Sequence, residues 1–231
     1  MDSLAAIWSY LMSWRYSVVV RRRRCGSRVL LLLLVLLAGC RFHNTYIPRA
    51  DGFYLNPDKD LHVIGRVAIV ELDNDSSYPQ VSADVTEALF VALQKKQVFG
   101  LTVVRQQDPA WRGLQLELNS TYDLEQLVTI RKTLQCDAIL VGTVTEYRPY
   151  PHLVMGLRMK LIDLKDGELL WALERVWDAA DKATQRRIES YLQRRVRSDP
   201  ASLDEQLVVV SSLQFVKFVA YEVGETLRPH R

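Results

Sequence analysis

The residue types best suited to catalysis or metal binding are scattered along this chain. Its four histidines, His43, His62, His152 and His230, lie far apart, and none belongs to a His-Glu-x-x-His pattern, which would place two zinc ligands on one helix face. The chain also lacks the Gly-x-Ser-x-Gly turn of serine hydrolases and a glycine-rich loop that would hold a phosphate. The sequence therefore predicts no enzyme activity, no metal site and no cofactor.

Carboxylates and cysteines give no stronger signal. The segment Asp73-Asn74-Asp75 lacks the glycine and the distal glutamate of an EF-hand loop, so we expect a solvated turn there. The chain has three cysteines, at positions 25, 40 and 136, without the spacing of a disulfide framework or a zinc site. Cys136 stands between a predicted helix and a predicted strand, where we expect a small buried hydrophobic residue.

A basic segment followed by an apolar one precedes Cys40. Arg21–Arg24 and Arg28 come first, and the uninterrupted apolar run is Val29 to Ala38. A membrane-spanning helix needs about 20 apolar residues. The apolar part of a secretory signal has about 7 to 15 and follows a positively charged segment. Residues 1–39 are therefore predicted to be a signal peptide, and the alternative is an uncleaved N-terminal membrane anchor.

The end of this segment resembles the lipobox of bacterial lipoproteins and reads Leu37-Ala38-Gly39-Cys40. The resemblance implies cleavage between Gly39 and Cys40 and attachment of acyl chains to Cys40, which would anchor the protein to a membrane. Arg41 stands where many lipoproteins retained at the inner membrane carry an acidic residue. By this resemblance we expect the outer membrane, facing the periplasm, and the inner membrane is left open.

Removal of residues 1–39 changes the charge of the chain. This segment holds six of the 30 Lys and Arg residues and one of the 27 Asp and Glu residues, so 24 basic and 26 acidic residues remain. The formal net charge thus changes from +3 to −2. The apparent basicity belongs mostly to the signal segment, and nucleic acid is not expected as a partner.

The rest of the chain predicts a tether followed by one domain. Residues 40–60 are rich in Pro, Asn, Asp and Gly and are predicted to be a tether. In residues 61–231 the pattern predicts strand, helix, strand, helix and strand, in that order. The predicted ranges are 62–72, 81–97, 99–106, 120–135 and 137–147. In the fourth element, Asp123 and Gln126 have the spacing of a capping box, and Leu124, Leu127, Val128 and Leu134 are expected to face the core.

A hairpin and two helices are predicted to complete the domain. Residues 153–161 alternate between apolar and mostly polar or small side chains, Asp166-Gly167 supplies a turn, and Leu169, Trp171 and Leu173 continue the apolar face. Residues 178–197 predict a mostly polar helix and 203–228 an apolar one, whose first part could instead form a strand. The expected fold class is α/β: a single domain with a mixed sheet, a C-terminal β-hairpin and helices packed on the sheet.

Two of these segments resemble a group of envelope lipoproteins. They are the strand of residues 136–144 and the hairpin start of residues 162–170, which read CDAILVGTV and IDLKDGELL. The group includes the curli-secretion lipoprotein CsgG, the penicillin-binding-protein activator LpoB and the N-terminal domain of TolB, and the resemblance covers roughly residues 63–173. Strand and turn patterns dictate fold more than function, so the resemblance implies a fold first of all. Since none of these members is itself an enzyme, it also implies a non-enzymatic envelope role.

Arginines on the polar helix are the candidate binding residues. Arg186, Arg187, Arg194, Arg195 and Arg197 have spacings that place much of their charge on one face. They either form a basic patch for an acidic partner or belong to an ordinary solvated face. We expect a lipid-anchored accessory protein that binds or helps assemble an envelope complex through an unidentified partner protein. The alternative is an oligomeric component of the curli-secretion type, so a homo-oligomer is left open.

Overall fold

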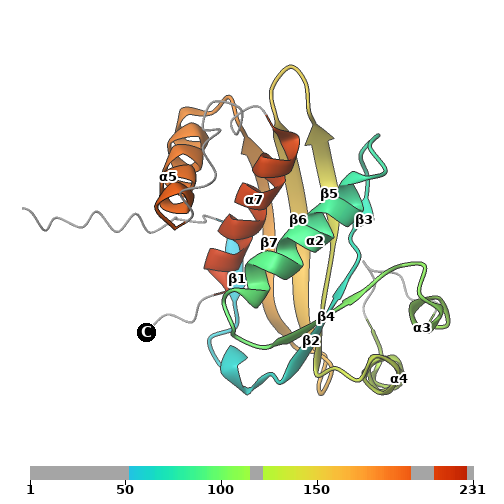
Figure 1. Cartoon of the computed structure of the whole chain (residues 1–231). Coiled ribbons are helices and arrows are strands. Elements are labelled where there is room, and N and C mark those ends of the chain that lie inside the picture. Colours follow the sequence, from blue (N-terminus) through green and yellow to red (C-terminus); the bar gives the residue numbers. More distant parts are fainter. Residues whose placement is uncertain (1–51, 115–121, 199–210, 228–231) are drawn as a thin grey trace, which may run out of the picture. The chain divides into compact units, whose positions relative to one another are not determined.

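A mixed seven-stranded sheet forms the centre of the unit that begins at Pro48, with strand order β1-β7-β6-β5-β2-β4 and β3 paired to β5 (Figure 1). The structure, a computed structural model, describes residues 52–114, 122–198 and 211–227. The strands are β1 (Phe53–Leu55), β2 (Arg66–Val70), β3 (Asp73–Asn74), β4 (Gly100–Val104), β5 (Ala138–Arg148), β6 (Val154–Asp163) and β7 (Leu169–Asp178). The predicted fold class is confirmed by this sheet and the helices packed on it.

The hairpin of β6 and β7 follows the predicted alternation. Every odd position from 153 to 161 is buried, and Gly167 has a φ of +78° in the turn, a conformation that residues with a Cβ rarely adopt. The register shifts between Leu161 and Ile162. As a result Leu170, rather than the predicted Leu169, joins Trp171 and Leu173 in the core.

The parallel half of the sheet consists of β2, β4 and β5, connected by helices as the strand–helix–strand order predicts. The expectation of a solvated turn at residues 73–75 is wrong in part, because Asp73 and Asn74 form β3 and pair with Thr143 and Val144. Partial burial also raises the pKa of Asp73, an effect that a hydrogen bond from Gln106 partly offsets.

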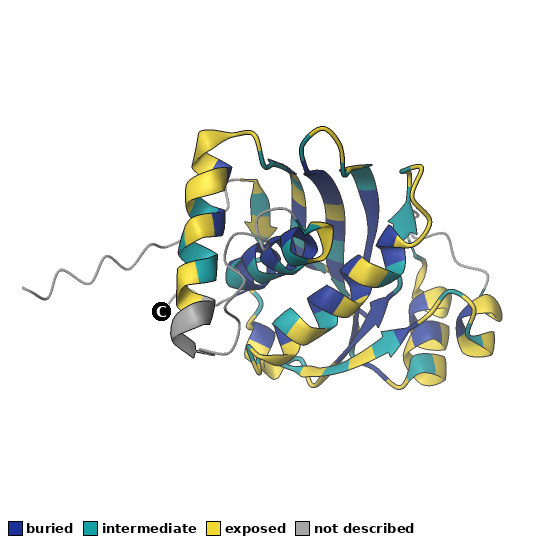
Figure 2. Cartoon of the chain, turned by 45° about the horizontal axis from the view of Figure 1, so that its top comes forward, coloured by how far each residue is buried: buried dark blue, intermediate teal, exposed yellow. Residues whose placement is uncertain are grey.

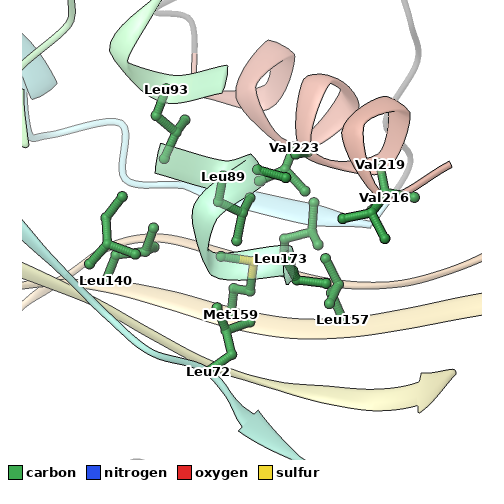
Figure 3. Close-up of a cluster of buried hydrophobic side chains, with 14 of the residues drawn as sticks. Leu72, Leu89, Leu93, Leu140, Leu157, Met159, Leu173, Val216, Val219 and Val223 are labelled. Carbon is green, nitrogen blue, oxygen red and sulfur yellow. The ribbon is translucent and has the colours of Figure 1, made fainter. Parts of the chain in front are cut away.

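One face of the sheet is covered by α2 (Val81–Gln94) and α7 (Ser212–Thr226), with α5 (Lys182–Ser198) beside α7 (Figures 1 and 2). Leu89 of α2, Val219 of α7 and Leu157 of β6 are all fully buried, and Figure 3 shows them within one cluster. In α7 the expected core positions 216, 220, 223 and 227 are buried, whereas Leu213 is 46% exposed. The predicted start of this helix, from residue 203, lies outside the described residues.

The other face carries α3 (Pro109–Arg112) and α4 (Leu124–Leu134). The capping box predicted for α4 is present: the Asp123 side chain accepts from the Gln126 backbone, and the Gln126 side chain accepts from the Asp123 backbone. The predicted apolar face is partly wrong, since Leu124 is 68% and Val128 47% exposed. Leu127 and Ile130 are the residues of α4 that are fully buried, with the expected buried Cys136 in the same cluster.

The N-terminal part of the described chain belongs to the sheet. Phe53–Leu55 pair antiparallel with Trp171–Leu173 of β7, so the predicted tether of residues 40–60 extends too far into the fold. A short 3-10 helix, η1 (Leu61–Val63), replaces the start of the strand expected at 62–72. Among the described residues, no helix has both the length and the apolar character needed to cross a bilayer.

Candidate functional site: helix α5 and the adjoining groove

The side chain of Asp181 caps the N-terminus of helix α5. The Asp181 carboxylate accepts hydrogen bonds from the backbone nitrogen and the hydroxyl of Thr184, at 2.9 and 3.0 Å. These bonds, the backbone one first, lower the pKa of Asp181, because they stabilise its ionised form. A carboxylate at this place also interacts favourably with the helix dipole. The helix therefore starts at Lys182, four residues after the predicted start at 178, because Asp178 still belongs to β7.

The inner side of α5 is attached to the domain by a thin apolar line and one ion pair. Ile188 is buried, and Tyr191 and Leu192 are half-buried, as their spacing predicts. The Arg187 side chain is only 10% exposed, and its Nε donates to Oε2 of Glu222 in α7 at 3.0 Å. Arg187 therefore points inward, toward a partner within the chain.

Glu222 is the centre of a buried polar network. Its carboxylate is 2% exposed and also accepts a 3.0 Å hydrogen bond from the indole nitrogen of Trp177. Arg175 of β7 places a guanidinium nitrogen 3.9 Å from the same carboxylate, and its guanidinium lies 5.3 Å from the centre of the Trp177 ring. A buried charge is tolerated where partners of this kind compensate its lost hydration. The network thus joins α5, α7 and β7.

The remaining arginines of α5 are exposed where the structure describes their side chains. Arg186 and Arg194 are both exposed, and eight residues of helix separate them by about 12 Å. Arg194 donates to the Tyr221 hydroxyl at 2.9 Å, which orients its guanidinium along the surface of α7. The side chains of Arg195 and Arg197 lie outside the described residues. Of the five predicted arginines, the structure thus places Arg186 and Arg194 at the surface and gives Arg187 a structural partner.

A groove of about 480 Å³ opens where α2, α5 and α7 meet. Its apolar surface includes Val91 and Leu213, which are 42% and 46% exposed. Its charged residues are Asp84, Glu87, Lys95, Lys96, Arg194 and Lys217, and Tyr191 and Tyr221 line it as well. Partial burial, followed by the nearby Glu225 carboxylate, raises the pKa of Tyr221, so its hydroxyl stays protonated at neutral pH.

Neither the Glu222 network nor the groove was predicted from the sequence. Glu222 could have been singled out, because it follows Phe215 and Phe218 at the spacing of the buried stripe of α7, where a charged residue needs a partner. No sequence signal identified Arg175 as one of its neighbours. The predicted processing site, Gly39 and Cys40, lies outside the described residues. Within the described ranges, no group of three or more His, Cys, Asp or Glu side chains could hold a metal ion.

No protein-family model matches this chain, and no curated protein sequence matches it. Solved structures share part of its fold. A PelC dodecamer from Paraburkholderia phytofirmans is 16% identical, covers 58% of this chain and 85% of its own, and has a TM-score of 0.40. LpoB from E. coli is 19% identical, with coverages of 51% and 62% and a TM-score of 0.38.

A lipoprotein from Neisseria meningitidis is similar over 58% of this chain and 98% of its own, with 14% identity and a TM-score of 0.38. These comparisons confirm that LpoB and a second lipoprotein are among the structural neighbours, as the sequence resemblance predicts. The resemblance to CsgG and TolB stays a prediction. At these identities and TM-scores the likeness concerns part of the fold, and no function is carried over from it.

Proposed function

We propose that this chain is a lipid-anchored, non-enzymatic accessory protein of the bacterial cell envelope, which acts by binding a partner protein. The anchor would be Cys40, after cleavage of residues 1–39, and the residues that follow it up to β1 would connect it to the domain. The proposal for the anchor rests on the lipobox-like Leu37-Ala38-Gly39-Cys40 and on the short apolar run before it. The proposed location is the periplasmic side of the outer membrane.

The observation that supports binding most directly is the two-sided character of α5. Its inner side is fixed by the Arg187–Glu222 pair, Arg186 faces solvent, and Arg194 is exposed at the edge of the helix beside Tyr221 of α7. A rigid helix with exposed guanidinium groups suits carboxylate recognition, because arginine donates to carboxylates in a fixed, often bidentate geometry. We therefore propose that the partner presents an acidic surface to α5.

The test has two parts, so that the anchor and the binding surface are judged separately. The first compares the intact mass and the membrane fractionation of the native protein with those of a Cys40→Ala variant. The expected native product starts at an acylated Cys40, and the variant is expected to stay unprocessed. If both proteins keep residues 1–39 and fractionate alike, the anchor proposal is wrong.

The second part is crosslinking in intact cells with a double variant, Arg186→Glu with Arg194→Glu. Reversal of two charges at an interface should lower the yield of the main partner adduct about tenfold or more, because like charges then face each other. The matched control is Arg112→Glu with Lys132→Glu, the same change of charge at exposed positions on α3 and α4. Equal losses in both variants would contradict a role for α5.

A further inference from the structure

The exposed stripe of α2 has a charge pattern that can pair with itself. Glu87, Val91 and Lys95, the last being the C-cap residue of α2 with helical φ and ψ, follow one another at intervals of four residues, so they lie on one side of the helix over about 12 Å. All three are exposed, and Val91 is 42% exposed at the centre. The stripe therefore runs from a carboxylate through an apolar side chain to an ammonium group.

The two charged groups of this stripe have no ion-pair partner within the described residues. Neither Glu87 nor Lys95 lies within salt-bridge distance of an opposite charge there, whereas the neighbouring Lys96 pairs with Glu225. An i, i+8 separation of about 12 Å also keeps Glu87 and Lys95 from pairing with each other. Both charges are thus available to a second molecule.

We propose that this stripe is a contact between two copies of the chain, related by a two-fold axis at Val91. In an antiparallel pair of α2 helices, Glu87 of each copy lies opposite Lys95 of the other, because both residues are four positions from Val91. A two-fold contact requires such self-complementarity. If residue i of one copy contacts residue j of the other, then residue j of the first copy contacts residue i of the second. One stripe thus supplies two equivalent ion pairs around one apolar centre.

The groove beside α2 enlarges this contact beyond the exposed side of α2 itself. Leu213 of α7, 46% exposed, lines the same groove as Val91, so that each copy adds a second exposed apolar side chain to the groove. Tyr191 and Tyr221 line the groove as well, and tyrosine is among the residues enriched in protein interfaces. The ridge of one α2 would pack into the space between α2 and α7 of the other copy.

This contact shares one residue, Arg194, with the proposed partner surface, because Arg194 lines the groove and Arg186 does not. The substitutions that test the contact leave both arginines unchanged. The two-fold contact requires neither a lipid at Cys40 nor an acidic partner. Its experiment can therefore fail or succeed independently of the proposed function.

The test is a site-specific crosslink of the full chain in intact cells that express two differently tagged copies. A Val91→Cys variant treated with a short, membrane-permeable bis-maleimide should form a dimer that contains both tags, because a two-fold axis at this position brings the two thiols together. Val128→Cys on α4 is the matched control, since Val128 is 47% exposed. The parent chain gives the background from its own cysteines.

Charge reversals then examine the proposed geometry. In the Val91→Cys background, Glu87→Lys alone or Lys95→Glu alone should lower the dimer yield about tenfold, because each change places two pairs of like charges across the axis. The double variant with both changes restores opposite charges and should restore the yield. All the substituted side chains are exposed, so circular dichroism should show an unchanged fold. A Val91 crosslink no stronger than that of Val128, or a double variant no better than the single ones, overturns the proposal.

Discussion

On one face of the sheet, α2 and α7 bury a continuous cluster that extends from Leu61 to Leu227, whereas on the other face α3 and α4 cover a smaller one around Val70, Ile130 and Cys136. Beyond that smaller cluster the second face of the hairpin is exposed at Arg158, Glu174 and Val176. Both surfaces proposed for binding, on α5 and on α2, are built on the face with the larger core. Both proposed surfaces thus lie over the cluster with more buried residues.

The largest effect is expected at Glu222, a buried carboxylate on the face with the larger cluster. Glu222→Leu leaves Arg187 and the Trp177 indole nitrogen without their acceptor and should lower the free energy of unfolding by about 3–5 kcal/mol. Glu222→Gln retains an acceptor oxygen, and a loss of about 1.5–3 kcal/mol is expected. Urea denaturation measures both values. The control Glu189→Gln, at an exposed position of α5, should change little, and a neutral Glu222→Leu would show that the network adds no stability.

A pair of leucine truncations compares the two faces directly. Leu89→Ala opens a cavity between α2, α7 and the sheet and should cost about 4 kcal/mol, near the upper part of the range for buried leucines. Leu127→Ala, in the smaller cluster, should cost about 2–3 kcal/mol, because its surroundings can collapse more readily. Denaturation under identical conditions gives the difference. Equal costs would mean that the two faces are equally tightly packed.

The thiol of Cys136 reports on the smaller cluster alone. Burial raises the pKa of Cys136 to about 11, so at pH 8 the native thiol stays protonated and should react slowly with maleimide. Under strongly native conditions, where the thiol reacts through local opening, Leu127→Ala should accelerate this reaction and Leu89→Ala should not. Because the thiol of the unfolded chain has an ordinary pKa of 9.0, the contribution of Cys136 to stability is present below pH 9 and decreases as the pH rises toward 11. Equal acceleration by both variants would contradict separate packing of the faces.

The smallest effect concerns the start of α4. Asp123→Ala removes the acceptor for the Gln126 backbone nitrogen and should lower the free energy of unfolding by about 1 kcal/mol. Asp123→Asn keeps an acceptor of the same length and should be nearly neutral. Thermal unfolding distinguishes the two variants. If both lose the same stability, the charge of Asp123 rather than its hydrogen bond supports the helix.

Local patterns in the sequence predicted the elements well, and the errors arise where tertiary packing decides. The alternation in β6 and the Asp166-Gly167 turn are local, so both were predicted. On α4, by contrast, helical spacing placed Leu124 and Val128 in the core, but this helix lies over the smaller face and buries only part of its predicted stripe. Periodicity shows which residues share a side of a helix and cannot show how much of that side the sheet will cover.

In the candidate site, too, local patterns could be predicted and tertiary contacts could not. The arginines of α5 are visible in the sequence, but only tertiary structure separates Arg187, which faces Glu222, from Arg186, which faces solvent. The two residues are adjacent in the chain and differ by one helical step of about 100°. The groove could not be predicted at all, because α2 and α7 lie far apart in the sequence and meet only in the folded domain.

The attachment of β1 and Lys59 determines how mechanical load would enter the domain. Besides the pairing of β1 with β7, the Lys59 ammonium group lies 3.4 Å from Asp163 and 3.2 Å from Glu168, and it also pairs with Asp166 in the hairpin turn. A pull on the chain ahead of Phe53 therefore meets the hydrogen bonds of β1 first and the Lys59 cluster second, before it can reach the rest of the sheet. A domain held in this way resists traction at its own N-terminal strand, and displacements there would load β7 and the hairpin turn first.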